Sequence, residues 1–270
     1  MTNALSIGDN CIDYYLPPMN QKFIGGNALN AAIHMKQAGC PVAYLGAVGG
    51  DVEGKAILQK LSQKGIDVSH CQVYSTNTAF TKVELDADGN RHFLHEDIGA
   101  TASLRIDAAT LAYIHQFDLV HNTWLGRTAD YLKFFHNGNG NKISMDYGER
   151  YSEDFVDQTI QYVDIAFFST NPDQRSEAED LARRMFARGP QLIVVTMGDG
   201  GALAYDGSFS FQEAQQVDVV DTLGAGDTYI ATFIAYWIRG HSISKSMEYA
   251  AIAAAHTCTI LGAWEGSRLS

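Results

Sequence analysis

Short β-branched apolar runs alternate with longer segments of helical period along most of this 270-residue chain. This alternation is typical of parallel strands joined by crossover helices, and it predicts an α/β core. Each of three predicted helices is followed by a glycine, as the ends of helices commonly are. The predicted strands cover Leu5–Gly8, Val42–Val48, Leu119–Asn122, Ile143–Asp146, Ile165–Ser169, Leu192–Met197 and Val217–Val220, and the predicted helices cover Asn27–Ala38, Lys55–Lys64 and Ser176–Arg188.

Two segments interrupt this alternation. Residues 11–24 and 72–98 lack a helical period but carry strand-like residues, and Asp88-Gly89-Asn90 between two such runs is typical of a hairpin turn. We expect the two segments to form one small β-lid inserted into the α/β core. At this length we expect a single domain that covers residues 1–270.

Composition excludes several classes of protein. The chain has 31 acidic and 19 basic residues, a formal net charge of −12, and no basic run that would follow a nucleic-acid backbone. Its four cysteines lie far apart without a CxxC pair, which favours a reduced protein over a disulfide framework or a zinc site. The first residues do not form a secretory signal, and the apolar stretch Tyr229–Ile238 is half the roughly 20 residues of a membrane-spanning helix. We therefore expect a cytoplasmic protein that binds neither nucleic acid nor a membrane.

The segment Asp221–Asp227 is the strongest candidate for chemistry. It lies between a predicted strand and a helix, and Gly224, Ala225 and Gly226 leave backbone N–H groups bare where the helix begins. Such a helix start favours an anion, for example a phosphate. The carboxylate of Asp227 would repel a phosphate, so it suits a base better than a phosphate ligand. On its own, the motif is explained equally well by an ordinary aspartate-capped turn.

A second group of polar residues lies near the N-terminus. Ligands of open α/β sheets bind beyond the carboxyl ends of the strands, where carboxylates and amides satisfy the hydroxyls of a polyol. A helix cap at Asn27 and turn-shaping aspartates are the alternative, which is favoured when the group is taken alone. The candidates for binding a substrate here are Asp9, Asn10, Asp13, Gly25, Gly26 and Asn30.

Three other patterns do not fit the sites that they suggest. Gly49 to Lys55 has the spacing of a P-loop, but Ala56 stands where a hydroxyl should bind magnesium. Gly198-Asp199-Gly200 is followed by Leu203 in place of the third glycine of a dinucleotide site. The segment His92–Glu96 follows neither the HExxH nor the HxxEH order of zinc-binding motifs.

Taken together, three motifs resemble the successive signatures of the ribokinase (PfkB) family of carbohydrate kinases. They are Gly25-Gly26 with Asn30, residues 46–51 with Gly54, and Asp221–Asp227. The resemblance implies a ribokinase-like three-layer α/β/α fold with a mostly parallel central sheet and a small β-lid that can form a homodimer. It also implies that the γ-phosphoryl group of ATP, with Mg²⁺, is transferred to a hydroxyl of a small-molecule sugar.

The resemblance also implies roles for individual residues. Asp227 resembles the catalytic base, and Gly224, Ala225 and Gly226 resemble the anion hole of the family. Asp13, Gly25, Gly26 and Asn30 match sugar-binding positions, with Asp9 nearby. Asp221 resembles part of the region that binds a monovalent cation such as K⁺ in some members. The residues that match the nucleotide-binding segments are Asn171, Thr196, Gly198 and Gly201.

One motif departs from the family. Its Asn-x-x-Glu motif, which is associated with magnesium and phosphate, here runs from Asn171 to Gln174, so Asp173 or Glu177 is a candidate to supply the missing carboxylate.

The two ends of the chain indicate a subfamily. Residues 8–13 and Gly262-Ala263-Trp264 look most similar to the family members that phosphorylate the 6-hydroxyl of fructoselysine. If the substrate is a fructosamine, Asp9, Glu96 or Asp97 would favour its positively charged amino groups. The alternatives are a kinase of ribose, fructose or another small sugar, a module that binds sugar or nucleotide without reacting, and, least favoured, an NAD-dependent dehydrogenase.

Overall fold

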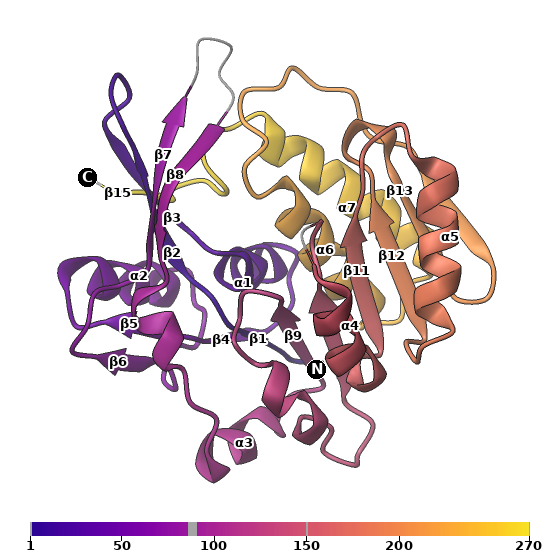
Figure 1. The fold of residues 1–270 in the computed structure, drawn as a ribbon, viewed down its shortest axis with the longest axis horizontal. Coiled ribbons are helices and arrows are strands. Elements are labelled where there is room, and N and C mark those ends of the chain that lie inside the picture. Colours follow the sequence, from indigo (N-terminus) through magenta and orange to yellow (C-terminus); the bar gives the residue numbers. More distant parts are fainter. Residues whose placement is uncertain (1, 86–90, 150, 270) are drawn as a thin grey trace.

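The computed structural model describes residues 2–85, 91–149 and 151–269. An eight-stranded sheet has the order β14-β13-β12-β11-β10-β9-β1-β4, in which six strands are parallel and the two at the β14 edge are antiparallel (Figure 1). The parallel strands are β1 (Ala4–Ile7), β4 (Val42–Leu45), β9 (Leu119–Thr123), β10 (Lys142–Asp146), β11 (Ile165–Ser169) and β12 (Leu192–Thr196), and the antiparallel strands are β13 (Ala202–Tyr205) and β14 (Phe209–Gln212).

Both faces of this sheet are buried. Along β11, Ile165 and Phe167 belong to one apolar cluster whereas Ala166 and Phe168 belong to the other, because successive side chains point to opposite faces. Helices α1 (Asn27–Gln37), α2 (Val52–Gln63), α6 (Ala225–Trp237) and α7 (Ile243–Cys258) contribute to the first cluster, and α3 (Ala108–Ile114), α4 (Glu153–Thr159) and α5 (Arg175–Phe186) contribute to the second. The predicted three-layer α/β/α fold is confirmed. Short 3₁₀ helices cover Gly99–Ser103, Ala129–Phe134, Ile160–Tyr162 and Gly198–Gly200.

A second, five-stranded sheet forms the lid. It has the order β15-β3-β2-β7-β8 and rises to one side of the main sheet, away from β12 and β13 (Figure 1). The expected hairpin turn Asp88-Gly89-Asn90 lies outside the described residues. Gln72–Tyr74 (β6) was expected in the lid, but it pairs with Ala47–Gly49 (β5) in a separate two-stranded sheet, so the lid begins later than predicted. The lid strands are β2 (Cys11–Tyr15), β3 (Gln21–Gly25), β7 (Phe80–Leu85), β8 (Arg91–Asp97) and β15 (Arg268–Leu269).

The predicted strand Val217–Val220 is wrong. This segment has no strand partner in the described part of the chain, and Val219 and Val220 are each 62% exposed. The run is exposed, and β-branched residues form a strand only where a neighbouring strand pairs with them and buries one face. The N–H groups of Val220 and Asp221 both donate to the carbonyl of Cys258 in α7.

The segment that resembled a P-loop starts helix α2. The carboxylate of Asp51 accepts hydrogen bonds from the N–H of Gly54 (2.8 Å) and from the N–H (2.7 Å) and hydroxyl (2.6 Å) of Thr78. It therefore caps the helix, as an aspartate at this position commonly does. Among the described residues, no helix is long and apolar enough to cross a membrane.

Candidate active site

Two cavities lie at the carboxyl ends of the parallel strands, the edge where open α/β sheets bind ligands. One, of about 500 Å³, is lined by residues that follow β11, β12 and β14 and by α6 and α7. The other, of about 660 Å³, lies between the main sheet and the lid and is lined by β2, β7 and β8 together with the ends of β1 and β10. We call them the nucleotide cavity and the sugar cavity, for the ligands that their residues are predicted to bind.

The start of helix α6 lies where the two cavities meet. Glu149, Ser169, Thr222 and Gly226 line both of them. Within the described structure, the N–H groups of Gly226 and Asp227 have no hydrogen-bond acceptor, as is usual in the first turn of a helix. These N–H groups and the helix dipole favour negative charge at the junction, between a ligand in one cavity and a ligand in the other.

Gly224 shapes this junction without lining either cavity. Its backbone is left-handed (φ 73°), and an added Cβ would lie 2.6 Å from the Cβ of Ala263. Of the three residues predicted to form an anion hole, Ala225 lines the nucleotide cavity and Gly226 lines both.

Asp227 lies in the sugar cavity, fully buried at the start of α6. The pKa of its carboxyl group is raised to about 8, mainly by burial; the hydrogen bond from Asn30 lowers this pKa, and the nearby carboxylates of Asp146, Asp9 and Asp13 raise it. A carboxyl group with a pKa close to neutral pH is well matched to accept a proton from a hydroxyl.

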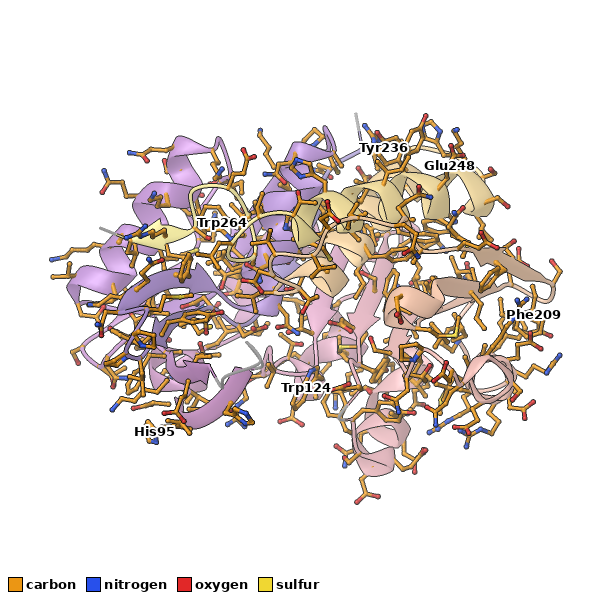
Figure 2. All side chains as sticks on the ribbon, turned by 90° about the horizontal axis from the view of Figure 1, so that it is seen from above. His95, Trp124, Phe209, Tyr236, Glu248 and Trp264 are labelled. Atoms are coloured by element: carbon orange, nitrogen blue, oxygen red, sulfur yellow. The ribbon has the colours of Figure 1, made fainter. Side chains whose placement is uncertain are left out.

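A two-step chain of hydrogen bonds positions this carboxylate. The indole N–H of Trp264 donates to Asn30 Oδ1 (3.1 Å), and the amide of Asn30 donates to Asp227 Oδ2 (2.8 Å). Trp264, labelled in Figure 2, is buried beside α1 and fixes which end of the Asn30 amide faces Asp227. Asn30, predicted to bind the sugar, therefore also orients the candidate base.

Asp9 has a structural role beside its place in the cavity. Its carboxylate accepts the N–H of Asn27 (2.7 Å) and of Ala28 (3.3 Å) and the hydroxyl of Thr123 (2.6 Å). It thus caps helix α1, whose N-cap residue, Gly26, has no side chain to do so. Burial is the larger influence and raises the pKa of Asp9.

Asp13 and the two glycines fit together at the base of the lid. Asp13 is buried and lines the sugar cavity. A Cβ on Gly25 would lie 2.6 Å from Asp13 Oδ2, so the glycine leaves room for the carboxylate, although Gly25 itself does not line the cavity. Gly26 lines it and has φ 107°.

The sequence analysis missed one polar residue of the sugar cavity, Asp146; Asn10, which it did single out, also lines this cavity. Asp146 ends β10, and burial raises the pKa of its carboxyl group to about 6. Asn10 donates both N–H bonds that its amide can make, to the hydroxyl of Tyr44 (3.0 Å) and the carbonyl of Ala47 (2.9 Å), which leaves its buried Oδ1 without a donor among the described residues. The position of Asp146 at the carboxyl end of a predicted strand was the available signal.

The sugar cavity is lined by many carboxylates. Its lining includes no lysine, arginine or histidine among the described residues. Such a lining suits a ligand rich in hydroxyl or ammonium groups and repels an anion. The carboxylates that line it are those of Asp9, Asp13, Glu96, Asp97, Asp146, Glu149 and Asp227.

The nucleotide cavity contains all four residues predicted to bind the cofactor, namely Asn171, Thr196, Gly198 and Gly201. Val217 and Val219, from the irregular segment before α6, supply part of an apolar wall that suits a purine base. Neither Asp173 nor Glu177 is among the residues that line it. The carboxylate at the junction is that of Glu149, which the sequence analysis did not single out.

Asp221, predicted to lie in a cation-binding region, lines neither cavity. Its Oδ1 accepts the N–H of Leu223 (2.9 Å), and its Oδ2 accepts the N–H of Gly262 (2.9 Å). These contacts join the segment before α6 to the C-terminal loop that carries Trp264.

Known proteins are similar to this chain along most of its length. The family model of the pfkB family carbohydrate kinases matches residues 1–125 and 158–267. The chain is 33% identical over 266 residues to the fructoselysine 6-kinase of Shigella flexneri, covering 98% of this chain and 100% of that protein. It is 29% identical over 264 residues to the fructosamine kinase FrlD of Bacillus subtilis, covering 96% and 92%.

Solved structures share the fold. A ribokinase of Arabidopsis thaliana complexed with ribose and ATP superimposes with a TM-score of 0.84 at 20% identity, over 97% of this chain and 95% of that one. A putative ribokinase II of E. coli in complex with ATP and Mg²⁺ has a TM-score of 0.83 at 20% identity, over 99% and 96%.

Proposed function

We infer that this chain, which belongs to the pfkB family of carbohydrate kinases, transfers the γ-phosphoryl group of ATP to the 6-hydroxyl of fructoselysine or of a related fructosamine. Its family makes it a phosphotransferase with a sugar hydroxyl as acceptor; the individual sugar is the proposal. The observation that carries it is the meeting of an acid-lined sugar cavity with a second cavity at the start of α6, beside Asp227.

In this mechanism, each group has a defined part in one displacement. Asp13 and Asn30 hold the sugar so that its primary hydroxyl lies beside Asp227. As the hydroxyl oxygen bonds to the γ-phosphorus and the bond to the ADP oxygen breaks, Asp227 takes the hydroxyl proton. The N–H groups at the start of α6 stabilise the charge on the transferring phosphoryl group. Such transfers depend mainly on positioning and charge stabilisation.

The residues at the junction fit a magnesium ion bound together with ATP. Mg²⁺ in kinase sites keeps several waters and is held by one or two protein oxygens and the phosphates, so one carboxylate between the cavities is sufficient. We assign this part to Glu149, because it lines both cavities while Gln174 carries an amide and lines neither. Bound there, Mg²⁺ would neutralise phosphate charge during the transfer.

The charge of the sugar cavity favours a fructosamine over other sugars. The cavity's carboxylates attract the ammonium group of a fructosamine, are neutral toward ribose or fructose beyond hydrogen bonding, and repel a sugar that already carries a phosphate. Two relatives that this chain matches over nearly their whole length are named as kinases of fructoselysine or fructosamine.

A panel of acceptors that differ in charge tests this assignment. We expect kcat/KM to fall in the order fructoselysine, fructose, fructose 1-phosphate, because the same cavity meets a cation, a neutral sugar and an anion while all three keep the 6-hydroxyl free. Magnesium-dependent ADP release from ATP, with a no-sugar control, measures it. A preference for ribose or fructose over every fructosamine would keep the kinase mechanism but refute the proposed substrate. Ligand binding without ADP release would instead indicate a binding module.

The raised pKa of Asp227 predicts how activity depends on pH. Below about pH 8 the carboxyl group of the free enzyme is largely protonated and cannot take a proton, so kcat/KM is expected to rise with pH and to level off above about 8. Fructose is the suitable acceptor for this profile because it has no group that ionises in this range. A kcat/KM that stays constant from pH 6 to pH 9 would contradict the assignment of Asp227 as the base.

A monovalent cation near Asp221, a homodimer through the lid and a cytoplasmic location stay predictions from the sequence. Size-exclusion chromatography with light scattering and assays with K⁺ replaced by an organic cation test the first two.

A further inference from the structure

Three side chains form a row across the inner face of the lid. Asp13 on β2 is paired with Thr81 on β7, and Thr81 is paired with Glu96 on β8. Residues paired across neighbouring strands point to the same face of a sheet. All three line the sugar cavity. Because neighbouring strands lie about 4.8 Å apart, the backbone of Glu96 is roughly 10 Å from that of Asp13, about the width of a sugar with one substituent.

Glu96 is a carboxylate of this cavity that has no partner among the described residues. Asp9 caps α1 and Asp97 Oδ1 accepts the N–H of Gly99 (2.8 Å), so both are committed to backbone groups. Asp227 is held by Asn30. Glu96 is exposed, and within the described parts of the chain no hydrogen bond or ion pair holds its carboxylate.

An independent feature of the same cavity also calls for a ligand that donates hydrogen bonds. The amide of Asn10 has both N–H groups engaged, and its buried Oδ1 accepts no hydrogen bond from any described residue. A buried acceptor without a donor is costly unless a ligand supplies one. Hydroxyl and ammonium groups donate hydrogen bonds, whereas carboxylates and phosphates only accept them.

We propose that Glu96 binds the ammonium group attached to C1 of a fructosamine while Asp13 binds the sugar hydroxyls, so that this lid residue selects amino-substituted sugars over free sugars. The inference rests on the proposed function for the identity of the acceptor. It assigns to Glu96 a part in selectivity, and leaves the proton transfer to Asp227. Whatever amino acid or alkyl group the ammonium carries then extends past β8 toward solvent, so the preference should not depend on a lysine tail.

The test compares Glu96→Gln with Glu84→Gln. Glu84 is exposed on the same lid, but its place in β7 puts it on the opposite face from Thr81 and Glu96. For the wild type and both variants, KM is measured for fructose, an N-butyl fructosamine and fructoselysine. We expect Glu96→Gln to raise KM for both fructosamines by about fivefold or more and to leave KM for fructose unchanged. Glu84→Gln should change none of the three.

Salt gives a readout that a merely structural role would not move. An exposed ion pair weakens as ionic strength rises, so the wild-type KM for N-butyl fructosamine should rise with added KCl and that of Glu96→Gln should rise less. The inference would be overturned if Glu96→Gln raised KM equally for fructose and for the fructosamines, or raised neither.

Direct binding separates this inference from the proposed function. Calorimetric titration of N-butyl fructosamine into the wild type and Glu96→Gln gives Kd without turnover. If no fructosamine is phosphorylated but its Kd still depends on Glu96, the proposed function fails and the inference holds. If fructosamines are phosphorylated and their Kd is unaffected by Glu96→Gln, only the inference fails. If they do not bind at all, both fail.

Discussion

Asp227→Asn is expected to lower kcat by at least about 10²–10⁴-fold and, at the same time, to raise the melting temperature. The loss of rate follows because a positioned base contributes about this factor and an amide cannot take the hydroxyl proton. The asparagine has nearly the same shape, so ATP binding and the contact with Asn30 are expected to persist.

The gain in stability follows from the same burial that raises the pKa. The folded-state pKa of about 8 lies far above the value of 3.8 of an exposed aspartate, so the contribution of Asp227 to folding falls as pH rises from about 4 and levels off above about 8. At pH 7 most of this loss of folding stability is therefore present, and a neutral amide in place of the carboxyl group removes it. For a chain of this size each kcal/mol of stabilisation raises the melting temperature by about 2–4 °C.

Asp154→Asn is the matched control for this variant, because Asp154 is an exposed acid in the first turn of another helix, α4. It should change neither kcat nor the melting temperature appreciably. Steady-state ADP release and calorimetric melting at pH 7 measure both quantities. An Asp227→Asn enzyme with near-normal kcat would remove Asp227 from the mechanism, and a lower melting temperature would contradict the cost assigned to its burial.

Gly26→Ala is expected to be strongly destabilising. A Cβ at this position would lie 2.4 Å from the Cα of Asn10 and 3.0 Å from two more of its backbone atoms, where nothing flexible can move aside. Such overpacking costs about 1–3 kcal/mol, and φ 107° adds about 1–3 kcal/mol of backbone strain. The backbone must shift to relieve this contact, which displaces Asn10 and the start of α1, so kcat/KM should fall as well.

Gly207→Ala separates the two causes. Gly207 has φ 109°, almost the same backbone conformation, but a Cβ there meets no atom within 4 Å. It should therefore show the backbone strain without the contact. Denaturant unfolding of the two variants beside the wild type gives the difference as the cost of the contact alone. Equal losses for both would show that the close approach of Gly26 to Asn10 contributes nothing.

The sequence predicted the elements whose cause is local. Five of the predicted strands have counterparts at nearly the same residues in the main sheet, because a short continuous apolar run is typical of a strand buried on both faces of a parallel sheet. The predicted strand Val42–Val48 is divided into β4 and β5. The failure at Val217–Val220 has a physical reason too, since β-branched residues favour a strand only where an edge is available to pair with. Here that segment instead lines the nucleotide cavity.

The contacts that complete the site join distant parts of the chain, and the local periods of strands and helices do not predict such contacts. Trp264 reaches Asn30 across 234 positions, and Asn30 reaches Asp227 across 197. The place of Glu149 between the two cavities likewise depends on where the segment after β10 passes the start of α6. The motifs thus predicted which residues take part, whereas the positioning contacts required the folded structure.

The transfer of phosphate to a defined hydroxyl of a fructosamine tests the account most directly. Purified protein is incubated with ATP, Mg²⁺ and fructoselysine, ADP is quantified, and the phosphorylated carbon is identified by ³¹P and ¹³C NMR, with the 6-deoxy analogue as control. The account predicts one ADP for each fructoselysine 6-phosphate formed and no product from the analogue. Phosphate on another hydroxyl, or ADP release that is the same with and without the sugar, would contradict it.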